Sequence, residues 1–467
     1  MKLSEGIYAW AVIASLKLLL SKCYRSTDFE VHRHWKATTY SLPFAQWYTD
    51  NTSHWTLDYP PFFAYFEWLL AQVAVLVDPG IVALGNDGYA SDACVMFMRA
   101  TVVLGDLFLI LVSILYLKER ANTKTLALIV ASPALVIVDN IHFQYNAWLF
   151  GMFILSIFLI DRGWVHCGAA VFTALVCAKH IFAYVGPVML VYLLKTYVSS
   201  SSRKFTSLAV TVASVVAVAV APLISTGQLT AAVGRMFPFG RGLVHAYWAP
   251  NIWALYLFTD RLIAKLFGVV VPSGTHGLVQ DVHFAVLPNI TPLVSLVTTL
   301  LLYYPLLMVI WRQPRQWPLA VWAAMGSFVA FLAGWHVHEK AILMVLIPLA
   351  LEAQRNINLS AIYANLSVIA GVSLLPLLPN RAETLLKWAI LMTGLSLDNL
   401  LLVPSASMVY YPALAAGFYS DFLHSIGPLA TWKFLPLMLV SVVCAVLNLQ
   451  SFFNLLMLTS RPRPKST

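Results

Sequence analysis

Charged residues are scarce in this chain. Asp, Glu, Lys and Arg make up 10% of its 467 residues, whereas about 25% is usual in soluble domains. Hydrophobic residues make up 60%, which is more apolar surface than a water-soluble fold of this size can bury. The same two values exclude an intrinsically disordered chain. The composition is therefore typical of a membrane protein with many spanning segments.

Short segments of alternating polarity, the pattern of a membrane β-barrel, are also missing. The apolar runs are long and continuous, so we predict an all-α, polytopic membrane protein that forms one integral domain over 1–467. A spanning helix needs about 20 apolar residues, and the runs provide about fourteen such helices. The expected spans are 5–21, 96–117, 125–140, 147–160, 164–178, 181–195, 205–224, 285–310, 317–334, 341–352, 359–378, 382–402, 406–426 and 431–456.

Two further apolar runs, 62–77 and 252–270, contain charged or polar residues. We expect interfacial or re-entrant helices there, and a true span at either run would change the total. The first run, 5–21, resembles a signal peptide because Lys2 precedes it. However, 21–25 lacks the small residues of a cleavage site, so we expect an uncleaved first helix.

Cysteine is also rare. The five cysteines show no metal-ligand spacing, and we expect no metal site. Most lie in or beside apolar runs, where a buried free thiol is the simplest interpretation. Cys23 and Cys94 can alternatively face one compartment and pair.

The formal net charge is +9, and the cations occupy short loops between the apolar runs. This distribution follows the positive-inside rule, and no nucleic-acid motif accompanies it, so nucleic acid is not an expected partner. We therefore expect both termini and these basic loops to be cytosolic. The opposite side then receives two long segments, 22–95 and 225–284, which we treat as the first and second large extracytosolic loops.

Carboxylates follow the first predicted helix on that opposite side. Asp28 and Glu30 are two residues apart, and either a general base or a helix cap at Thr27 or Asp28 explains the pattern. Asp58 and Tyr59 precede two prolines that fix an extended entry into the run at 62–77. Asp58 is therefore also either a functional carboxylate or a cap.

Amide and imidazole groups gather at the end of the predicted helix 125–140. The sequence there contains His142, Gln144, Tyr145 and Asn146. Such side chains both donate and accept hydrogen bonds, which suits hydroxyl-rich ligands such as sugars. A polar turn with interfacial aromatic residues is the alternative interpretation. Lys179, at the same predicted boundary, is either a ligand or a snorkelling lysine.

Arginines on the non-cytosolic side run against the charge rule. Arg235 and Arg241 precede an aromatic stretch with Trp248 and Asn251. Arginine is well suited to phosphate oxygens, although a loop packed by aromatic residues with solvated cations gives the same pattern.

A last polar motif begins the predicted helix at 341–352. His338, Glu339 and Lys340 follow Trp335 and His336. Alternating histidines alone are a weak metal signal. His338 and Lys340 near a helix start suit an anionic group, and snorkelling is again the alternative for Lys340.

These motifs together resemble a known family. The chain looks like the endoplasmic-reticulum α-1,3-glucosyltransferases that use dolichyl-phosphate glucose, within the multi-spanning GT-C superfamily. The resemblance covers nearly the whole chain and is most specific at 27–35, 57–61, 142–146, 237–242 and 337–340. Features at 62–68, 245–251 and 335–340 are more similar to the member that adds the second glucose than to the member that adds the first.

The resemblance implies a GT-C type helix bundle and an inverting transfer. Dolichyl β-D-glucosyl phosphate is then the donor, Glc1Man9GlcNAc2 on dolichyl diphosphate the acceptor, and the lipid bilayer the surrounding medium. Asp28 is implied as the catalytic base, with Asp58, His338 and Glu339 as catalytic support. No cofactor or metal is implied. The remaining residues of the five motifs are expected to bind substrate: Glu30, Tyr59, His142, Gln144, Tyr145, Asn146, Lys179, Arg235, Arg241, Trp248, Asn251 and Lys340.

The family also implies the endoplasmic-reticulum membrane, with the site in the lumen. A glycosylation sequon at 51–53 and a weakly dibasic tail at 463–467 fit that location. Alternatives within the enzyme class are the first-glucose transferase and a user of dolichyl-phosphate mannose. A solute transporter is the main alternative of another class, although it should place charge in broken helices at the midplane rather than at one surface. A membrane scaffold has no reason to gather these groups on one side.

Overall fold

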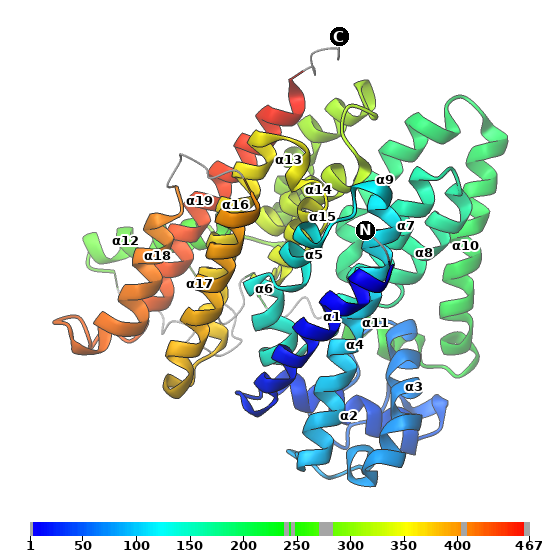
Figure 1. Ribbon diagram of the computed structural model, residues 1–467, viewed down its shortest axis with the longest axis horizontal. Coiled ribbons are helices and arrows are strands. Elements are labelled where there is room, and N and C mark those ends of the chain that lie inside the picture. Colours follow the sequence, from blue (N-terminus) through cyan, green and yellow to red (C-terminus); the bar gives the residue numbers. More distant parts are fainter. Residues whose placement is uncertain (1–2, 238–241, 244–247, 270–283, 403–408, 462–467) are drawn as a thin grey trace. The chain divides into compact units, whose positions relative to one another are not determined.

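The computed structural model describes residues 3–237, 242–243, 248–269, 284–402 and 409–461, and its regular elements are helices (Figure 1). The prediction of an all-α chain is confirmed. Contacts within the chain divide it into two compact units. Unit 1 comprises Met1–Leu126, Val138–Gly186 and Leu193–Pro238, and unit 2 comprises Ala127–Ile137, Pro187–Tyr192 and Phe239–Thr467. The short helices α5 (Thr123–Val130), α6 (Pro133–Leu135) and α9 (Gly186–Leu193) lie where the chain passes from one unit to the other.

Unit 1 is a set of helices packed in sequence order. Helix α1 packs on α4, α4 on α7, α7 on α8 and α8 on α10, while α2 packs on α3 (Figure 1). Their bounds are α1 Leu3–Leu19, α2 Thr27–Ser41, α3 Pro61–Val77, α4 Asp92–Leu117, α7 Asn146–Asp161, α8 Val165–Val176, α10 Ser202–Ser225 and α11 Leu229–Met236.

Two glycines explain the close approach of α4 and α7. Gly105 on α4 faces the Trp148 ring, and Gly151 on α7 faces the Phe108 ring, so a Cβ at either position would clash with the ring. Small residues that admit a large partner are the usual device of membrane helix interfaces. Trp148 Nε1 also donates to the Thr101 carbonyl at 3.0 Å, which fixes the register of the two helices.

Unit 2 is built around α14 and α15, whose side chains are buried along the whole length of both helices. Around them, α13 packs on α14, α16 on α17 and α19, and α12 on α19. The Asp260 carboxylate on α12 accepts from the backbone amides of residues 285–287. The bounds are α12 Ile252–Leu266, α13 Pro292–Arg312, α14 Leu319–Ala333, α15 Leu343–Ala350, α16 Ile357–Leu374, α17 Thr384–Leu401, α18 Tyr411–Phe418 and α19 Leu435–Ser460.

Several helices are long and apolar enough to cross a membrane, so the chain is a polytopic membrane protein. In the described part of the chain there are seven such helices, or eight if a bent pair is one span. The seven are Asp92–Leu117, Thr123–Phe143, His180–Val198, Ser202–Ser225, Pro292–Arg312, Ile357–Leu377 and Leu435–Ser460. The expected number of about fourteen stays a prediction.

Some of the expected apolar runs form helices that are shorter or less regular than a full span. The run 62–77 forms the 17-residue helix α3, and 147–160 and 164–178 also form apolar helices shorter than the seven spans. Residues 406–408 lie outside the described residues, and the rest of the 406–426 run forms α18 followed by π and 3-10 turns. Helix α1 is followed by a 3-10 turn, Leu20–Lys22, after which the chain bends by 98° into α2.

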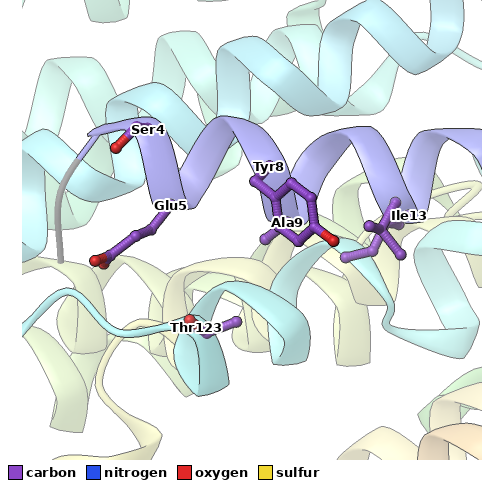
Figure 2. A pocket seen from close by; sticks show the side chains of 7 residues that line it. Ser4, Glu5, Tyr8, Ala9, Ile13 and Thr123 are labelled. Carbon is purple, nitrogen blue, oxygen red and sulfur yellow. The ribbon is translucent and has the colours of Figure 1, made fainter.

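A groove runs along the start of α1. It is lined by Ser4, Glu5, Tyr8, Ala9, Val12, Ile13 and Thr123. Figure 2 shows Tyr8, Ala9 and Ile13 on the helix face that borders the groove, with Thr123 opposite. The groove contains none of the predicted site residues, so we do not take it as the candidate site.

Candidate functional site

The first carboxylate motif begins a helix that is capped by a serine. Ser26 Oγ accepts from the Asp28 backbone amide at 3.1 Å and donates to the His142 carbonyl. Ser26 is the N-cap of α2, so the hypothesis that Thr27 or Asp28 caps this helix is wrong. Asp28 instead lies in the first turn, where a negative charge is favoured by the helix dipole.

The Asp28 carboxylate contacts two side chains of the 139–146 segment. Gln144 Nε2 donates to Asp28 Oδ2 at 2.8 Å, and His142 Nε2 lies 3.3 Å from the same oxygen. The Asp28 side chain is 23% exposed. The carboxylate is therefore held by polar partners and still accessible to a further hydroxyl group.

A left-handed residue lies between these two partners. Phe143 has φ +85° and a buried ring that packs against Phe29 at 5.2 Å and Tyr145 at 5.4 Å between centroids. Arg99 donates to the carbonyls of Asn140 and Ile141 just before the turn. The turn is thus fixed by packing and by one buried guanidinium.

Further polar groups extend from Gln144 into unit 1. Asn146 Nδ2 donates to Gln144 Oε1 at 2.9 Å and to Asp139 Oδ1 at 2.8 Å. Lys179 Nζ donates to Asn146 Oδ1 at 3.0 Å and lies 5.2 Å from the centre of the Tyr59 ring. These residues form one connected group with Asp28.

The second carboxylate motif does not cap its helix either. Pro60 is the N-cap of α3 and makes no side-chain cap bond, so the hypothesis that Asp58 caps this helix is wrong. Asp58 is half-buried. Burial raises the pKa of the Tyr59 hydroxyl well above its ordinary value, and the Asp58 carboxylate adds to the rise. Tyr59 is therefore a neutral hydrogen-bonding group at physiological pH.

A buried ionic cluster joins α2 and α3. His32 Nδ1 is 2.6 Å from Glu67 Oε1, and Lys36 Nζ is 2.6 Å from Glu67 Oε2. Lys36 also donates to the Tyr145 hydroxyl at 3.0 Å, and that hydroxyl is 2.9 Å from Thr101 Oγ1. Tyr145, expected to bind substrate, is 2% exposed and is part of this cluster. Sequence reasoning did not assign His32, Lys36 or Glu67, although a carboxylate within the apolar run 62–77 was a signal.

Two other predicted residues bond to protein groups of unit 1. Glu30 forms a two-oxygen ion pair with Arg33, at 3.0 Å and 2.9 Å from Arg33 Nε. Arg235 donates to the Asp50 carbonyl at 2.7 Å and to Asn51 Oδ1 at 3.0 Å. Arg235 therefore ties α11 to the sequon at 51–53.

The remaining predicted residues belong to unit 2. His336 has φ +52°, and its Nδ1 is 2.9 Å from the Gly242 carbonyl oxygen. The His338 ring lies 5.3 Å from the His336 ring. Glu339 is buried at the start of a 3-10 turn, Glu339–Ile342, and Lys340 is half-buried within it.

The aromatic stretch near residue 250 is part of the packed core of unit 2. Asn251 is the N-cap of α12 and donates to the Phe331 carbonyl at 3.1 Å. Trp248 is buried and packs against Phe434 at 4.8 Å between centroids. Arg241 lies outside the described residues.

The structure thus brings Asp28, His142, Gln144, Asn146 and Lys179 into one polar group in unit 1. The residues of the 338–340 motif, with Trp248 and Asn251, lie in unit 2. The five cysteines are free thiols. Within the described ranges, no group of three or more His, Cys, Asp or Glu side chains is placed to hold a metal ion. An accessible carboxylate ordered by amide and imidazole groups, in a multi-pass helical chain, has the features of a membrane-embedded enzyme.

Comparison with known proteins identifies the family of this chain. Residues 13–455 match the model of the ALG6, ALG8 glycosyltransferase family, and the chain belongs to this family. An Arabidopsis thaliana relative is 44% identical over 402 residues, which cover 83% of this chain and 79% of the relative. A Schizosaccharomyces pombe relative is 39% identical over 490 residues, which cover 96% and 97%. Both are named dolichyl pyrophosphate Glc1Man9GlcNAc2 alpha-1,3-glucosyltransferase.

A third relative extends the comparison to animals. The Drosophila melanogaster protein is 45% identical over 384 residues, which cover 79% of this chain and 75% of the relative. It is named probable dolichyl pyrophosphate Glc1Man9GlcNAc2 alpha-1,3-glucosyltransferase.

Proposed function

We propose that this protein transfers glucose from dolichyl β-D-glucosyl phosphate to Glc1Man9GlcNAc2 on dolichyl diphosphate and forms an α-1,3 linkage with inversion. The names of the plant, fungal and insect relatives support the acceptor and the linkage. The donor and the inversion rest on the sequence resemblance. The structural observation that carries the proposal is the accessible Asp28 carboxylate, bonded to Gln144 and 3.3 Å from His142.

The reaction asks one protein group to remove a proton. The acceptor 3-hydroxyl oxygen bonds to the anomeric carbon of glucose while the bond from that carbon to the phosphate oxygen breaks. Asp28 takes the hydroxyl proton, and dolichyl phosphate leaves with the electron pair. A carboxylate suits this role because it accepts hydrogen bonds only, so a substrate hydroxyl that contacts it presents its proton.

The leaving phosphate needs positive charge more than it needs an acid. We assign this role to Arg241 and Lys340, together with His338. Asp58 and Glu339 are assigned as supporting carboxylates. Tyr59, Trp248 and Asn251 are assigned to the walls of the substrate site. These roles rest on the match of the motifs to the family pattern.

The membrane arrangement is part of the proposal. A GT-C type bundle of about fourteen spans would place both termini in the cytosol and the segments 22–95 and 225–284 in the lumen of the endoplasmic reticulum. The basic short loops support this orientation, and so does the sequon at 51–53. Asp28 then lies at the lumenal boundary, where a lipid-linked sugar presents its anomeric carbon.

The decisive experiment identifies the lipid-linked glycan that accumulates in cells that lack the protein. Loss of the second glucosyl transfer leaves Glc1Man9GlcNAc2 on dolichyl diphosphate. Accumulation of Man9GlcNAc2 without glucose would identify the protein as the enzyme of the first step instead. Purified protein given each acceptor with dolichyl-phosphate glucose, and in parallel with dolichyl-phosphate mannose, tests the donor in the same way.

A further inference from the structure

The hydrogen bonds around Asp28 run in one direction, from a donor at one end of the group to an acceptor at the other. The Lys179 ammonium group can only donate hydrogen bonds, and the Asp28 carboxylate can only accept them. Two amide side chains, Asn146 and Gln144, lie between these ends. These two ends, together with the Asp139 carboxylate that also accepts from Asn146, therefore determine which way each amide must face.

The direction follows from the contacts one at a time. Lys179 donates to the oxygen of Asn146, at 3.0 Å. The nitrogen of Asn146 then faces the oxygen of Gln144, at 2.9 Å, and also Asp139 at 2.8 Å. The nitrogen of Gln144 is left to donate to Asp28, at 2.8 Å. A flipped Gln144 would place its oxygen against the carboxylate, with repulsion in place of a hydrogen bond.

We propose that Gln144 is a positioning residue for Asp28 and that Lys179, acting through Asn146, sets the orientation of its amide. This inference rests on the proposed function, because it assigns these residues to the base rather than to the sugar. It differs from the expectation that Gln144, Asn146 and Lys179 bind substrate. In the proposed arrangement, Lys179 affects the rate without contact with the reacting atoms.

The backbone supports the same interpretation. Phe143 adopts φ +85°, a left-handed conformation that is unfavourable for a residue with a side chain. This turn places the residues on both sides of Phe143 at one oxygen of Asp28, since His142 and Gln144 both face Oδ2. Such strain persists where the surrounding structure imposes it, as at functional sites. Phe143 is fully buried, and Arg99 holds the carbonyls of Asn140 and Ile141 just before the turn.

The test compares kinetics of purified full-length variants. Gln144→Met removes the amide with little change in volume. We expect kcat to fall about 10–100-fold, as for the loss of an orienting hydrogen bond to a charged group, while KM for donor and acceptor stays within about twofold of wild type. Lys179→Met should lower kcat in the same way, and Lys179→Arg, which keeps a donor-only cation, should restore most of it.

A pH profile adds a measurement that a merely structural role would not move. Loss of a hydrogen bond to the charged carboxylate favours its protonated form, so the acidic limb of kcat should move to higher pH in Gln144→Met. His142 lies 3.3 Å from the Asp28 carboxylate, His32 and Tyr59 interact with it electrostatically, and Asp139 and Lys179 belong to the same hydrogen-bonded group. All five are unchanged in the variant, so the shift reports on the lost amide.

Gln228→Met is the matched control. Gln228 is a buried amide of unit 1 that accepts from the Tyr48 backbone amide and donates to the Phe44 carbonyl. This variant should melt at a lower temperature but keep the wild-type kcat per folded molecule. The combined variant Gln144→Met with Lys179→Met should be little slower than Gln144→Met alone, because Lys179 acts through Gln144.

The possible outcomes separate the inference from the proposed function. A rise in KM at unchanged kcat, or additive effects of the two substitutions, would overturn the positioning role. Behaviour like Gln228→Met would overturn it too. Wild-type protein that uses Man9GlcNAc2 instead of the monoglucosylated acceptor would contradict only the proposed function, and the kcat comparison would then be made with that acceptor.

Discussion

Lys36 on α2 and Glu67 on α3 form an ion pair of 2.6 Å in which both side chains are completely buried. His32, one turn before Lys36, is 2.6 Å from the second oxygen of the same carboxylate. The pair joins the helix that begins beside Asp28 to its neighbour. A buried charge is tolerated only while its partner is present, because neither group can be solvated alone.

Removal of one partner should therefore destabilise the protein strongly. For Glu67→Gln or Lys36→Met we expect a loss of about 3–5 kcal/mol, measured as a lower midpoint of thermal unfolding in detergent. The double variant Lys36→Met with Glu67→Leu should regain much of the loss, because no unpaired charge remains. Single variants as stable as wild type would show that the pair does not stabilise the contact of α2 with α3.

The second prediction concerns Asp28 itself. Because Ser26 caps α2, Asp28→Asn leaves the cap intact and changes the shape very little. The amide cannot take a proton, so we expect single-turnover transfer to fall about 10²–10⁴-fold with donor binding retained. Asp92→Asn is the matched control, since Asp92 is also in the first turn of a helix that a serine, Ser91, caps. Near-normal transfer by Asp28→Asn would move the base assignment to Asp58.

The third prediction tests the orientation in the membrane. Asn51 and Asn358 are both exposed asparagines within sequons, at 51–53 and 358–360. The charge asymmetry of the loops predicts that the first lies in the lumen and the second beside a cytosolic loop, 352–355. Because 289–291 is a further sequon with an exposed asparagine, the test is made in an Asn289→Gln background. There we expect a glycosidase-sensitive mobility shift that Asn51→Gln abolishes and Asn358→Gln leaves unchanged. The reverse pattern would invert the proposed topology.

The fourth prediction concerns the cations assigned to the donor phosphate. Lys340→Ala and Arg241→Ala should each remove a charge-assisted hydrogen bond worth about 1.5–3 kcal/mol. The kinetic parameters for the donor should therefore worsen more than those for the acceptor. Lys265→Ala is the control, because Lys265 is a cation of the 225–284 segment that lies 4.2 Å from the centre of the Trp432 ring. Unaltered donor kinetics in both test variants would remove them from the phosphate site.

Much of the candidate site was predictable from residue types and their order. Polar motifs that recur after every second predicted span lie on one side of a membrane, and this indicated that Asp28 and Gln144 share that side. Their hydrogen bond joins residues 116 positions apart. This hydrogen bond depends on the left-handed turn at Phe143. A phenylalanine in the sequence does not predict such a turn, because the conformation is unusual for that residue type.

One local error and one missed contact have simple physical causes. Ser26, Thr27 and Asp28 are consecutive residues that all favour the N-cap position, so the pattern gave a helix start without its register. Glu67 lies in an aromatic run, where a charge suggested an interfacial helix. The structure places Glu67 against His32 and Lys36, and this contact was missed. The one-turn spacing of His32 and Lys36 is a signal only once the start of α2 is known.

Because the chain bends by 98° between α1 and α2, the length of the first helix affects where α2 begins and where Asp28 lies. Asp28 is reached from α1 through only a few residues, so the length of α1 has to match the position at which Ser26, Gln144 and His142 hold the start of α2 and the carboxylate. If the start of α1 stays in place, one added residue would displace the end of this helix by about 1.5 Å along its axis and rotate it by about 100°, which strains the contacts that hold Asp28. Changes in the length of α1 should therefore be tolerated far less than changes in its apolar sequence.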